Sequence, residues 1–266
     1  MELGLSGKKA IVTGGSAGIG LACAKALVRE GVDTVIAARD PKRLEQAVEQ
    51  IRSAAETPGQ NEVVAISADL TRAEDIKRVV QEAFKRLDRV DILINNAGSA
   101  RAGGFSELED RDFLDAWNLK LLGYIRMVRE VLPHMRKQQD GRIVNIIGGA
   151  ARTPSPTFLP GSTANAALLN FTKGISQDLA RDNIRINAIS PGPTSTERAK
   201  RLNRQLAEAK GISEEEAWQR SIGSIPRGRM VEPSEIAALA LFLVSDLAAS
   251  ILGAEVAIDG GSAPGV

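Results

Sequence analysis

The sequence predicts an α/β protein in which a doubly wound, seven-stranded parallel sheet lies between two layers of helices. Short apolar runs alternate with longer helical patterns along the whole chain, and the runs are apolar at nearly every position. Strands covered on both faces are continuously hydrophobic, and alternating strands and helices imply right-handed crossovers between parallel strands. The strands are expected at residues 8–12, 34–38, 63–67, 92–94, 142–147, 185–189 and 255–258.

The expected helices lie between these strands, and capping sequences mark several helix starts. Thr71, Ser106 and Ser213 each precede a glutamate by three residues, so each pair can form a capping box. The helices are expected at residues 18–31, 41–55, 73–87, 107–137, 162–182 and 233–245.

Composition and charge narrow the classes of protein to which the chain can belong. The 266 residues fit a single domain, residues 1–266, and the net charge of +1 gives no general attraction to nucleic acid or an anionic membrane. No apolar run approaches the roughly 18 residues needed to cross a bilayer. One histidine and one cysteine, Cys23, leave too few ligands for a metal site and allow no internal disulfide. We therefore expect a cytoplasmic enzyme or binding protein for a small molecule.

One stretch interrupts the alternation of strands and helices. Between Pro191 and Pro226 the sequence is rich in charge, serine and threonine, with short helical patterns at 197–210 and 213–222. Because this stretch follows a strand, it should lie at the carboxyl edge of the sheet, where open α/β sheets bind ligands. We expect residues 193–225 to form a mobile substrate lid, with a solvated surface excursion as the alternative.

A glycine-rich turn points to a dinucleotide site. Residues Thr13–Gly20 follow the first apolar run and open the first expected helix. Glycines without Cβ atoms let the backbone approach a pyrophosphate, and the helix N-terminus attracts its negative charge. The sequence therefore predicts that a dinucleotide binds at the first strand–helix turn.

Five further blocks follow this turn in a characteristic order. Together with it, they make the whole chain resemble the short-chain dehydrogenase/reductase family, especially its 3-oxoacyl carrier-protein reductases. The resemblance implies a Rossmann-type fold, a nicotinamide cofactor and a homotetramer built through residues 107–137, 162–182 and 254–266. The six blocks are Thr13–Gly20, Asp69-Leu70, Asn95–Gly98, Asn187–Thr196, Pro226–Ala237 and Asp259–Gly261.

In this family the blocks hold the cofactor, and the resemblance transfers those roles residue by residue. Asp69 would accept a hydrogen bond from the adenine amino group, although it could also cap the following helix. Pro191, Gly192 and Thr196 would hold the nicotinamide carboxamide and so fix the face that exchanges hydride. The expected cofactor-binding residues are Gly14, Ser16, Ala17, Gly18, Ile19, Gly20, Arg39, Asp69, Leu70, Asn96, Ala97, Gly98, Ile146, Pro191, Gly192, Thr194 and Thr196.

The end of the second strand indicates which nicotinamide the site prefers. Relatives that prefer NAD(H) place an acidic residue there for the ribose 2′-hydroxyl, whereas this strand ends at Arg39. The Arg39 guanidinium suits a 2′-phosphate, and Asp40 is expected to cap the helix that begins at Pro41. We therefore expect NADP(H) rather than NAD(H), although Ala17 stands where many NADP(H)-preferring relatives have a second basic residue.

The chain departs from the family at the positions that carry catalysis. The family uses a tyrosine as proton donor, a lysine four residues later, a serine, and an asparagine that completes a proton relay. Counting from the strand at 142–147 places Gly148 at the serine position and Gly161 at the tyrosine position. The lysine position is Asn165, and the relay asparagine position is Lys120. The missing phenol should leave space for a larger ligand, a chain of waters or a shifted side chain.

Lys120 and Asn165 exchange the two residue types of the family pattern. Their expected positions face each other across packed helices, so Lys120 could reach the ribose or polarise a substrate oxygen, with Asn165 assisting. Alternatively, Lys120 pairs with a carboxylate or extends to solvent. Ser162 is a weaker hydroxyl candidate for catalysis. The only tyrosine, Tyr124, is expected in the core or a subunit contact, and the only histidine, His134, at the surface.

Three functions remain open on these grounds. The first is an NADP(H)-dependent oxidoreductase with an atypical active site, transferring hydride to or from a small carbonyl or alcohol. The second is a non-catalytic NADP(H)-binding protein, such as a sensor or a supporting subunit, and the third is a non-redox enzyme with a structural cofactor. Loss of four catalytic positions favours the second. We expect the first, because retention of residues 191–196 indicates that the nicotinamide itself must be oriented.

Overall fold

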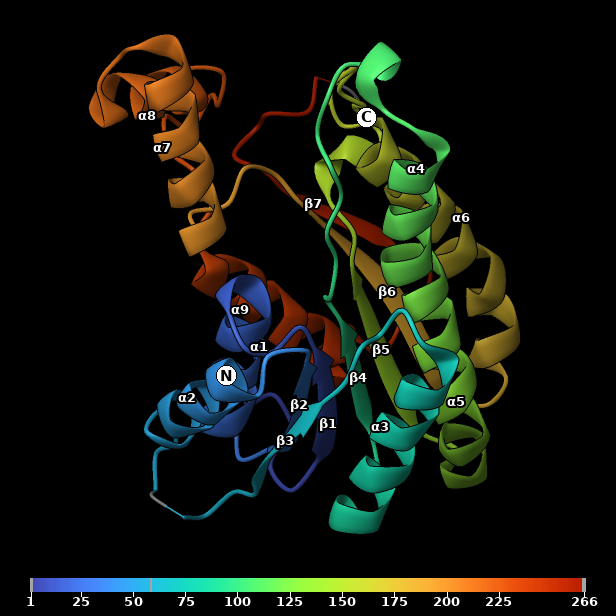
Figure 1. Ribbon diagram of the computed structural model, residues 1–266. Helices are drawn as coiled ribbons and strands as arrows, with labels where there is room; N and C mark the ends of the chain where they lie inside the picture. Colours follow the sequence, from blue (N-terminus) through green and yellow to red (C-terminus); the bar gives the residue numbers. More distant parts are fainter. Residues whose placement is uncertain (1, 58, 265–266) are drawn as a thin grey trace.

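The computed structural model describes residues 2–57 and 59–264, and within them seven parallel strands form one sheet (Figure 1). The strand order is β3-β2-β1-β4-β5-β6-β7, which confirms the predicted doubly wound fold. The direction of winding reverses between β1 and β4, and open sheets bind ligands beside such a point. The strands are β1 (Lys9–Thr13), β2 (Asp33–Ala38), β3 (Val63–Ser67), β4 (Ile92–Asn95), β5 (Gly141–Ile146), β6 (Ile184–Pro191) and β7 (Glu255–Ile258).

Helices cover both faces of the sheet (Figure 1). They are α1 (Gly18–Arg29), α2 (Pro41–Arg52), α3 (Ala73–Leu87), α4 (Asp110–Ala116), α5 (Gly123–Gln138), α6 (Leu159–Ala180), α7 (Glu197–Lys210), α8 (Glu214–Ile222) and α9 (Pro233–Val244). α1, α2 and α9 enclose one apolar core, which includes Leu27 and Leu243, and α3, α5 and α6 enclose the other, which includes Ile76 and Met127. Burial on both faces explains why the central strands β1, β2 and β4 are apolar at most positions, whereas β3 and β7 at the sheet edges are partly exposed. No helix in the described part of the chain has the length and apolarity that a membrane span requires.

The helix expected at residues 107–137 contains a π-helical segment. α4 continues through Trp117–Leu122, which is π-helical, into α5 without a break. The apolar periodicity did not indicate this segment, because a π turn changes the spacing over only a few residues. Lys120 lies within it, and π turns are frequent at functional sites.

Of the three residues expected to open capping boxes, only Ser213 caps a helix. Its Oγ accepts a hydrogen bond from the N–H three residues later at 3.1 Å and caps α8, but the Glu216 carboxylate accepts from Arg220 and does not complete the box. The Thr71 hydroxyl instead donates to Asp69 at 2.9 Å, and α3 begins after Arg72. Ser106 lies in a short 3₁₀ turn before α4, so the prediction of a helix start there was wrong.

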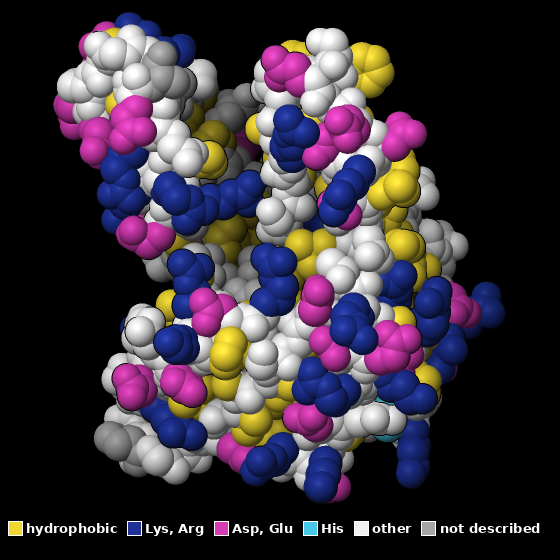
Figure 2. Space-filling view, viewed as in Figure 1, with side chains coloured by type: hydrophobic (Ala, Val, Ile, Leu, Met, Phe, Trp, Pro, Cys, Tyr) yellow, Lys and Arg dark blue, Asp and Glu magenta, His cyan; other side chains and the backbone are white. Residues whose placement is uncertain are grey.

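α7 and α8 form a hairpin that projects from the two helical layers (Figure 1). They pack on each other, and the Asn203 side-chain amide joins them by donating to the Glu214 carbonyl at 2.9 Å. The base of the hairpin is held where Thr194 pairs with Val231 in an isolated parallel bridge. Figure 2 shows a hollow between this hairpin and the rest of the molecule, bordered by lysine and arginine side chains.

Candidate active site

The turn between β1 and α1 is shaped for the close approach of a ligand. Gly14 and Gly18 have φ values of 66° and 55°, in the left-handed region that favours glycine. A Cβ on Gly14 would lie 2.8 Å from Asn96 Nδ2, and one on Gly20 would lie 2.3 Å from the Gly14 carbonyl oxygen. The N-cap, Ala17, contributes no side-chain hydrogen bond, so the first N–H groups of α1 are left for an anion.

Asn96 fixes this turn from the end of β4. Its side-chain amide donates to the carbonyl oxygens of Thr13 and Gly14 at 3.1 and 3.2 Å. The Thr13 hydroxyl in turn accepts hydrogen bonds from the backbone N–H groups of Asn96 and Ala97 at 2.9 and 3.2 Å. Asn96 and Ala97, which are expected to bind the cofactor, therefore lie directly beside the turn expected to hold the pyrophosphate.

A hollow of about 200 Å³ extends from this turn past the end of β2. Arg39 and Arg43 both line it, and both are exposed. Asp40 caps α2 as expected, because its Oδ1 accepts from the N–H groups of Lys42 and Arg43 at 3.0 and 3.2 Å. Sequence reasoning missed Arg43, although its position four residues after Arg39, in the first turn of a helix, was a usable signal.

The region after β3 forms the apolar wall of this hollow. Leu70 is buried and lines it together with Ala97. The Asp69 Oδ1 accepts from the Thr71 N–H and hydroxyl at 3.1 and 2.9 Å, so Asp69 does not cap α3. Its Oδ2 has no hydrogen-bond partner among the described residues, which leaves an acceptor for a ligand donor.

The block expected to hold the carboxamide forms the base of the α7–α8 hairpin. A Cβ on Gly192 would lie 2.7 Å from the Asp259 Cβ, so no larger residue fits there. The Thr194 hydroxyl donates to the Gly192 carbonyl at 2.9 Å. Thr196 caps α7 and lies beside the glycine turn, since a Cβ on Gly18 would be 3.4 Å from its Cγ2.

These regions together fit a nicotinamide dinucleotide. At the glycine turn, close packing against Asn96 and Thr196 excludes larger residues, and the N–H groups at the N-terminus of α1 are available to an anion. The basic hollow at Arg39 suits the nucleoside end, and Thr196 brings the carboxamide block to the other side of the turn. The residues of this chain could therefore hold such a cofactor along the carboxyl edge of the sheet.

A second cavity, of about 60 Å³, brings together Lys120, Gly161 and Asn165. The Lys120 ammonium donates to the carbonyl oxygen of Ile147 and has no carboxylate partner among the described residues. Gly98 makes room for its stem, because a Cβ there would approach the Lys120 Cδ to 3.1 Å. Burial of the ammonium, and then the charge of Arg198, lowers the Lys120 pKa from 10.5 to about 8. A lysine with this pKa can exchange a proton near neutral pH.

Asn165 lines this cavity, and its buried amide oxygen is unpartnered among the described residues. Its side chain is only 3% exposed, and its Oδ1 forms no hydrogen bond among the described residues. Gly148 lies next to it with a φ of 130°, and a Cβ there would be 3.0 Å from Asn165 Nδ2. A buried amide oxygen without a partner costs about 1–3 kcal/mol, which a polar ligand atom would recover.

Phe158 occupies the space beside Gly161. A Cβ on Gly161 would lie 2.2 Å from two atoms of the Phe158 ring, much closer than nonbonded atoms approach. The ring therefore fills the volume that a side chain at position 161 would take. The cavity that remains beside this ring, lined by Phe158 and Gly161, keeps a volume of about 60 Å³.

The remaining candidate residues lie outside this cavity. The Ser162 Oγ donates to the carbonyl oxygen four residues earlier at 2.9 Å, and Ser162 does not line the cavity. Tyr124 is buried, its hydroxyl donates to the carbonyl oxygen of Ile146 at 3.0 Å, and burial raises the pKa of Tyr124. His134 is exposed and stacks on a phenylalanine ring. The expected core and surface positions of Tyr124 and His134 are thus confirmed.

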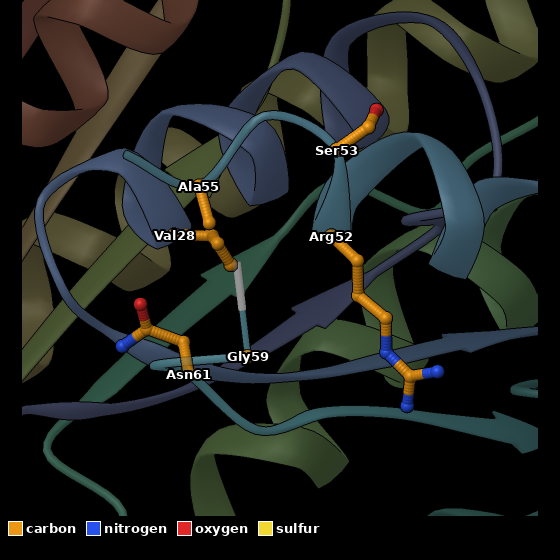
Figure 3. A pocket seen from close by; sticks show the side chains of 6 residues that line it. All are labelled: Val28, Arg52, Ser53, Ala55, Gly59 and Asn61. Atoms are coloured by element: carbon orange, nitrogen blue, oxygen red, sulfur yellow. The ribbon is translucent and has the colours of Figure 1, made fainter. Parts of the chain in front are cut away.

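Another hollow lies at the opposite end of the sheet, before β3 (Figure 3). Val28, Arg52 and residues of the loop that ends at Asn61 line it. The Arg52 side chain points away from Val28 in Figure 3 and donates to the carbonyl oxygen of Val63 at 3.1 Å. This hollow contains none of the expected site residues, so the candidate site is the one at the carboxyl edge.

Comparison with known proteins identifies the family. The family model for short chain dehydrogenases matches residues 8–207. The chain belongs to the short-chain dehydrogenase family. It is 34% identical over 255 residues to ketoacyl reductase 1 of the granaticin polyketide synthase from Streptomyces violaceoruber, covering 95% of this chain and 92% of that protein. It is 32% identical over 261 residues to the 3-oxoacyl-(acyl-carrier-protein) reductase of Aquifex aeolicus, covering 98% and 99%.

A solved structure of the same family shows how far the likeness extends in three dimensions. L-Sorbose reductase from Gluconobacter frateurii, in complex with NADPH and L-sorbose, superposes with a TM-score of 0.95. The two chains are 30% identical, and the superposition covers 100% of each. This short-chain dehydrogenase therefore shares its fold over its full length with a reductase solved in complex with NADPH.

Proposed function

We propose that this short-chain dehydrogenase is an NADP(H)-dependent oxidoreductase in which Lys120 is the proton donor to a small carbonyl substrate. The observation that carries the proposal is the Lys120 ammonium, which has a pKa of about 8 and faces a cavity at the carboxyl edge of the sheet. Its relatives named as ketoacyl reductases, and the NADPH-bound neighbour, support the cofactor and the reaction class.

The residues around this cavity have different roles in carbonyl reduction. The cofactor, when bound, supplies a hydride. Lys120 gives its proton to the carbonyl oxygen as the carbonyl carbon gains that hydride, so the C=O π bond is replaced by C–H and O–H bonds. The Asn165 amide orients the substrate oxygen, and the Ile147 carbonyl holds the ammonium in place. Solvent returns the proton to Lys120, so one NADPH and one proton are consumed per turnover.

The direct test of this proposal combines binding with turnover. NADPH should bind to the purified protein in calorimetry, and absorbance at the NADPH maximum should fall when a panel of small ketones, aldehydes and oxo acids is added. Tight NADPH binding without turnover on any panel member would favour a non-catalytic NADP(H)-binding protein. Absence of NADPH and NADH binding would contradict both functions.

We also propose that Arg39 and Arg43 select the 2′-phosphate of NADP(H). Replacing Arg39 by glutamine should raise the Kd for NADPH by about 10–100-fold, as expected for loss of one charge-assisted hydrogen bond. The Kd for NADH should change little, because NADH lacks the phosphate. Lys42→Gln is a matched control, since Lys42 is an exposed neighbour on α2 that does not line the hollow. An equal effect of Arg39→Gln on both nucleotides would contradict this assignment.

Two further roles belong to the same proposal. The α7–α8 hairpin, residues 193–225, acts as a lid over the hollow seen in Figure 2, and its base at Thr194 serves as the fixed end. The protein assembles as a homotetramer through residues 107–137, 162–182 and 254–266, of which 265–266 lie outside the described residues. Leu114 and Leu122 support this, because they are 60% and 40% exposed on one stretch of helix. Sedimentation of the purified protein would test the tetramer.

A further inference from the structure

The cavity at Lys120 carries positive charge that no described acidic residue balances. Lys120 and Arg198 are its charged lining residues, and no described aspartate or glutamate lines it. On α7, Lys200 Nζ lies 2.8 Å from Glu197 Oε1, whereas Arg198, Arg201 and Arg204 form no hydrogen bond or ion pair with any residue that the structure describes. Of these three exposed arginines, Arg198 is the one that lines the cavity.

Arg198 also occupies an unfavourable position for a cation. It is the second residue of α7, and the N-terminus of a helix carries partial positive charge that favours acidic residues. Its charge already lowers the pKa of Lys120, so the two cations interact across the cavity. A ligand anion beside Arg198 would offset the repulsion between Arg198 and the helix N-terminus and the repulsion between Arg198 and Lys120.

The amide of Asn165 is an independent sign of a ligand in the same cavity. It is only 3% exposed and unpartnered, and it lines the cavity together with both cations. The cavity volume of about 60 Å³ suits only a small ligand, and Lys120 and Arg198 both line it. A substrate that contacts both cations must therefore be small, with any further atoms in the hollow below the hairpin.

We propose that the substrate is a small oxo acid whose carboxylate pairs with Arg198 while its carbonyl oxygen meets Lys120 and Asn165. This inference rests on the proposed function and names its substrate class. The overall reaction converts the oxo acid, NADPH and one proton into the hydroxy acid and NADP⁺. Arg198 takes no part in proton transfer; it is a specificity residue that selects substrates with negative charge.

Binding without turnover gives the first test. Propionate and propionamide have nearly the same shape and differ in charge, so calorimetry of the protein saturated with NADP⁺ isolates the carboxylate. Propionate should bind at least about tenfold more tightly than propionamide, the range of a charge-assisted contact. Arg198→Gln should abolish this difference. Arg201→Gln is the matched control, because Arg201 is exposed on α7 and does not line the cavity, and it should preserve the difference.

Turnover gives the second test and separates the two proposals. NADPH oxidation should be faster with acetoacetate than with methyl acetoacetate, and Arg198→Gln should reduce kcat/KM for the acid alone, by about 10–100-fold. Turnover of the ester with no preference for propionate or acetoacetate would overturn the oxo-acid inference and leave the oxidoreductase intact. Propionate binding that depends on Arg198, without NADPH oxidation, would support a carboxylate site and overturn the oxidoreductase.

Discussion

Replacement of Lys120 by methionine is expected to lower kcat for carbonyl reduction by about 10²–10⁴-fold, the usual contribution of a positioned acid. Methionine keeps an apolar stem against Gly98 and removes the ammonium. The Kd for NADPH, measured by calorimetry, should stay within a few-fold of wild type. Lys120→Arg separates charge from proton transfer, because arginine keeps the charge but cannot release a proton. Activity in either variant above a tenth of wild type would contradict the role of Lys120.

The pH dependence of the wild-type enzyme follows from the same residue. Reduction requires the protonated lysine, so its rate should fall as pH rises through about 8, whereas alcohol oxidation should become faster over that range.

The free energy of unfolding should also depend on pH through Lys120. The pKa of Lys120 is lower in the folded state, so the unfolded chain binds more protons between about pH 8 and 10.5, and stability rises with pH there.

A comparison with Lys120→Met isolates this stability effect from that of all other groups. The difference in the Lys120 pKa between the folded and unfolded states corresponds to roughly 3 kcal/mol. The free energy of unfolding of wild type should therefore rise by about that amount relative to the variant between pH 7 and about 10.5. Urea unfolding of both proteins at the two pH values measures it. Parallel pH profiles of stability would show that the Lys120 pKa is unperturbed.

Introducing a tyrosine at position 161, the residue that the family resemblance implies there, is expected to lower the stability of the fold. Gly161→Tyr would force the Phe158 ring from its place, because even a Cβ would lie 2.2 Å from it. Overpacking of this kind costs about 1–3 kcal/mol in the free energy of unfolding. Phe158→Ala should open the same space. The double variant should therefore be more stable than the sum of the single effects predicts, by at least about 1 kcal/mol.

Alanine at two glycines of α6 provides a matched control for this effect. Gly174 is exposed, and a Cβ there would meet nothing within 4 Å, so Gly174→Ala should stabilise the helix by about 0.5–1 kcal/mol. Gly161→Ala should instead destabilise the protein because of Phe158. Equal effects of the two alanines in denaturant unfolding would show that the ring moves aside freely.

The arrangement of the fold was predictable because its signals are local. β3 and β7 begin and end where the apolar runs do, and α3 and α7 match their expected ranges. Each of these segments has a hydrophobic pattern and a distinct turn at its ends. The π turn at 117–122 was not predictable in this way, since it changes hydrogen bonding without changing which residues are apolar.

The candidate site was predictable only in part, for a related reason. Lys120 and Asn165 could be placed by counting from neighbouring motifs, and the structure brings them to one cavity. The contributions of Phe158 and Arg198 depend on how a proline-rich loop and a projecting helix fold back over the sheet. The hydrophobic periodicity of the sequence does not indicate how these segments fold back. Only the structure therefore shows that Phe158 lies beside Gly161 and that Arg198 lies near Lys120.

The hydrogen bonds of Asn96 join the end of β4 to the first turn through groups of the chain itself. Because these bonds order the backbone of the turn, little chain entropy is left to be lost when a dinucleotide associates. Differences in affinity between NADPH and NADH must then arise from the 2′ substituent of the ribose, which would contact exposed side chains such as Arg39. Substitution of Arg39 can therefore change the cofactor preference without altering the backbone of the glycine turn.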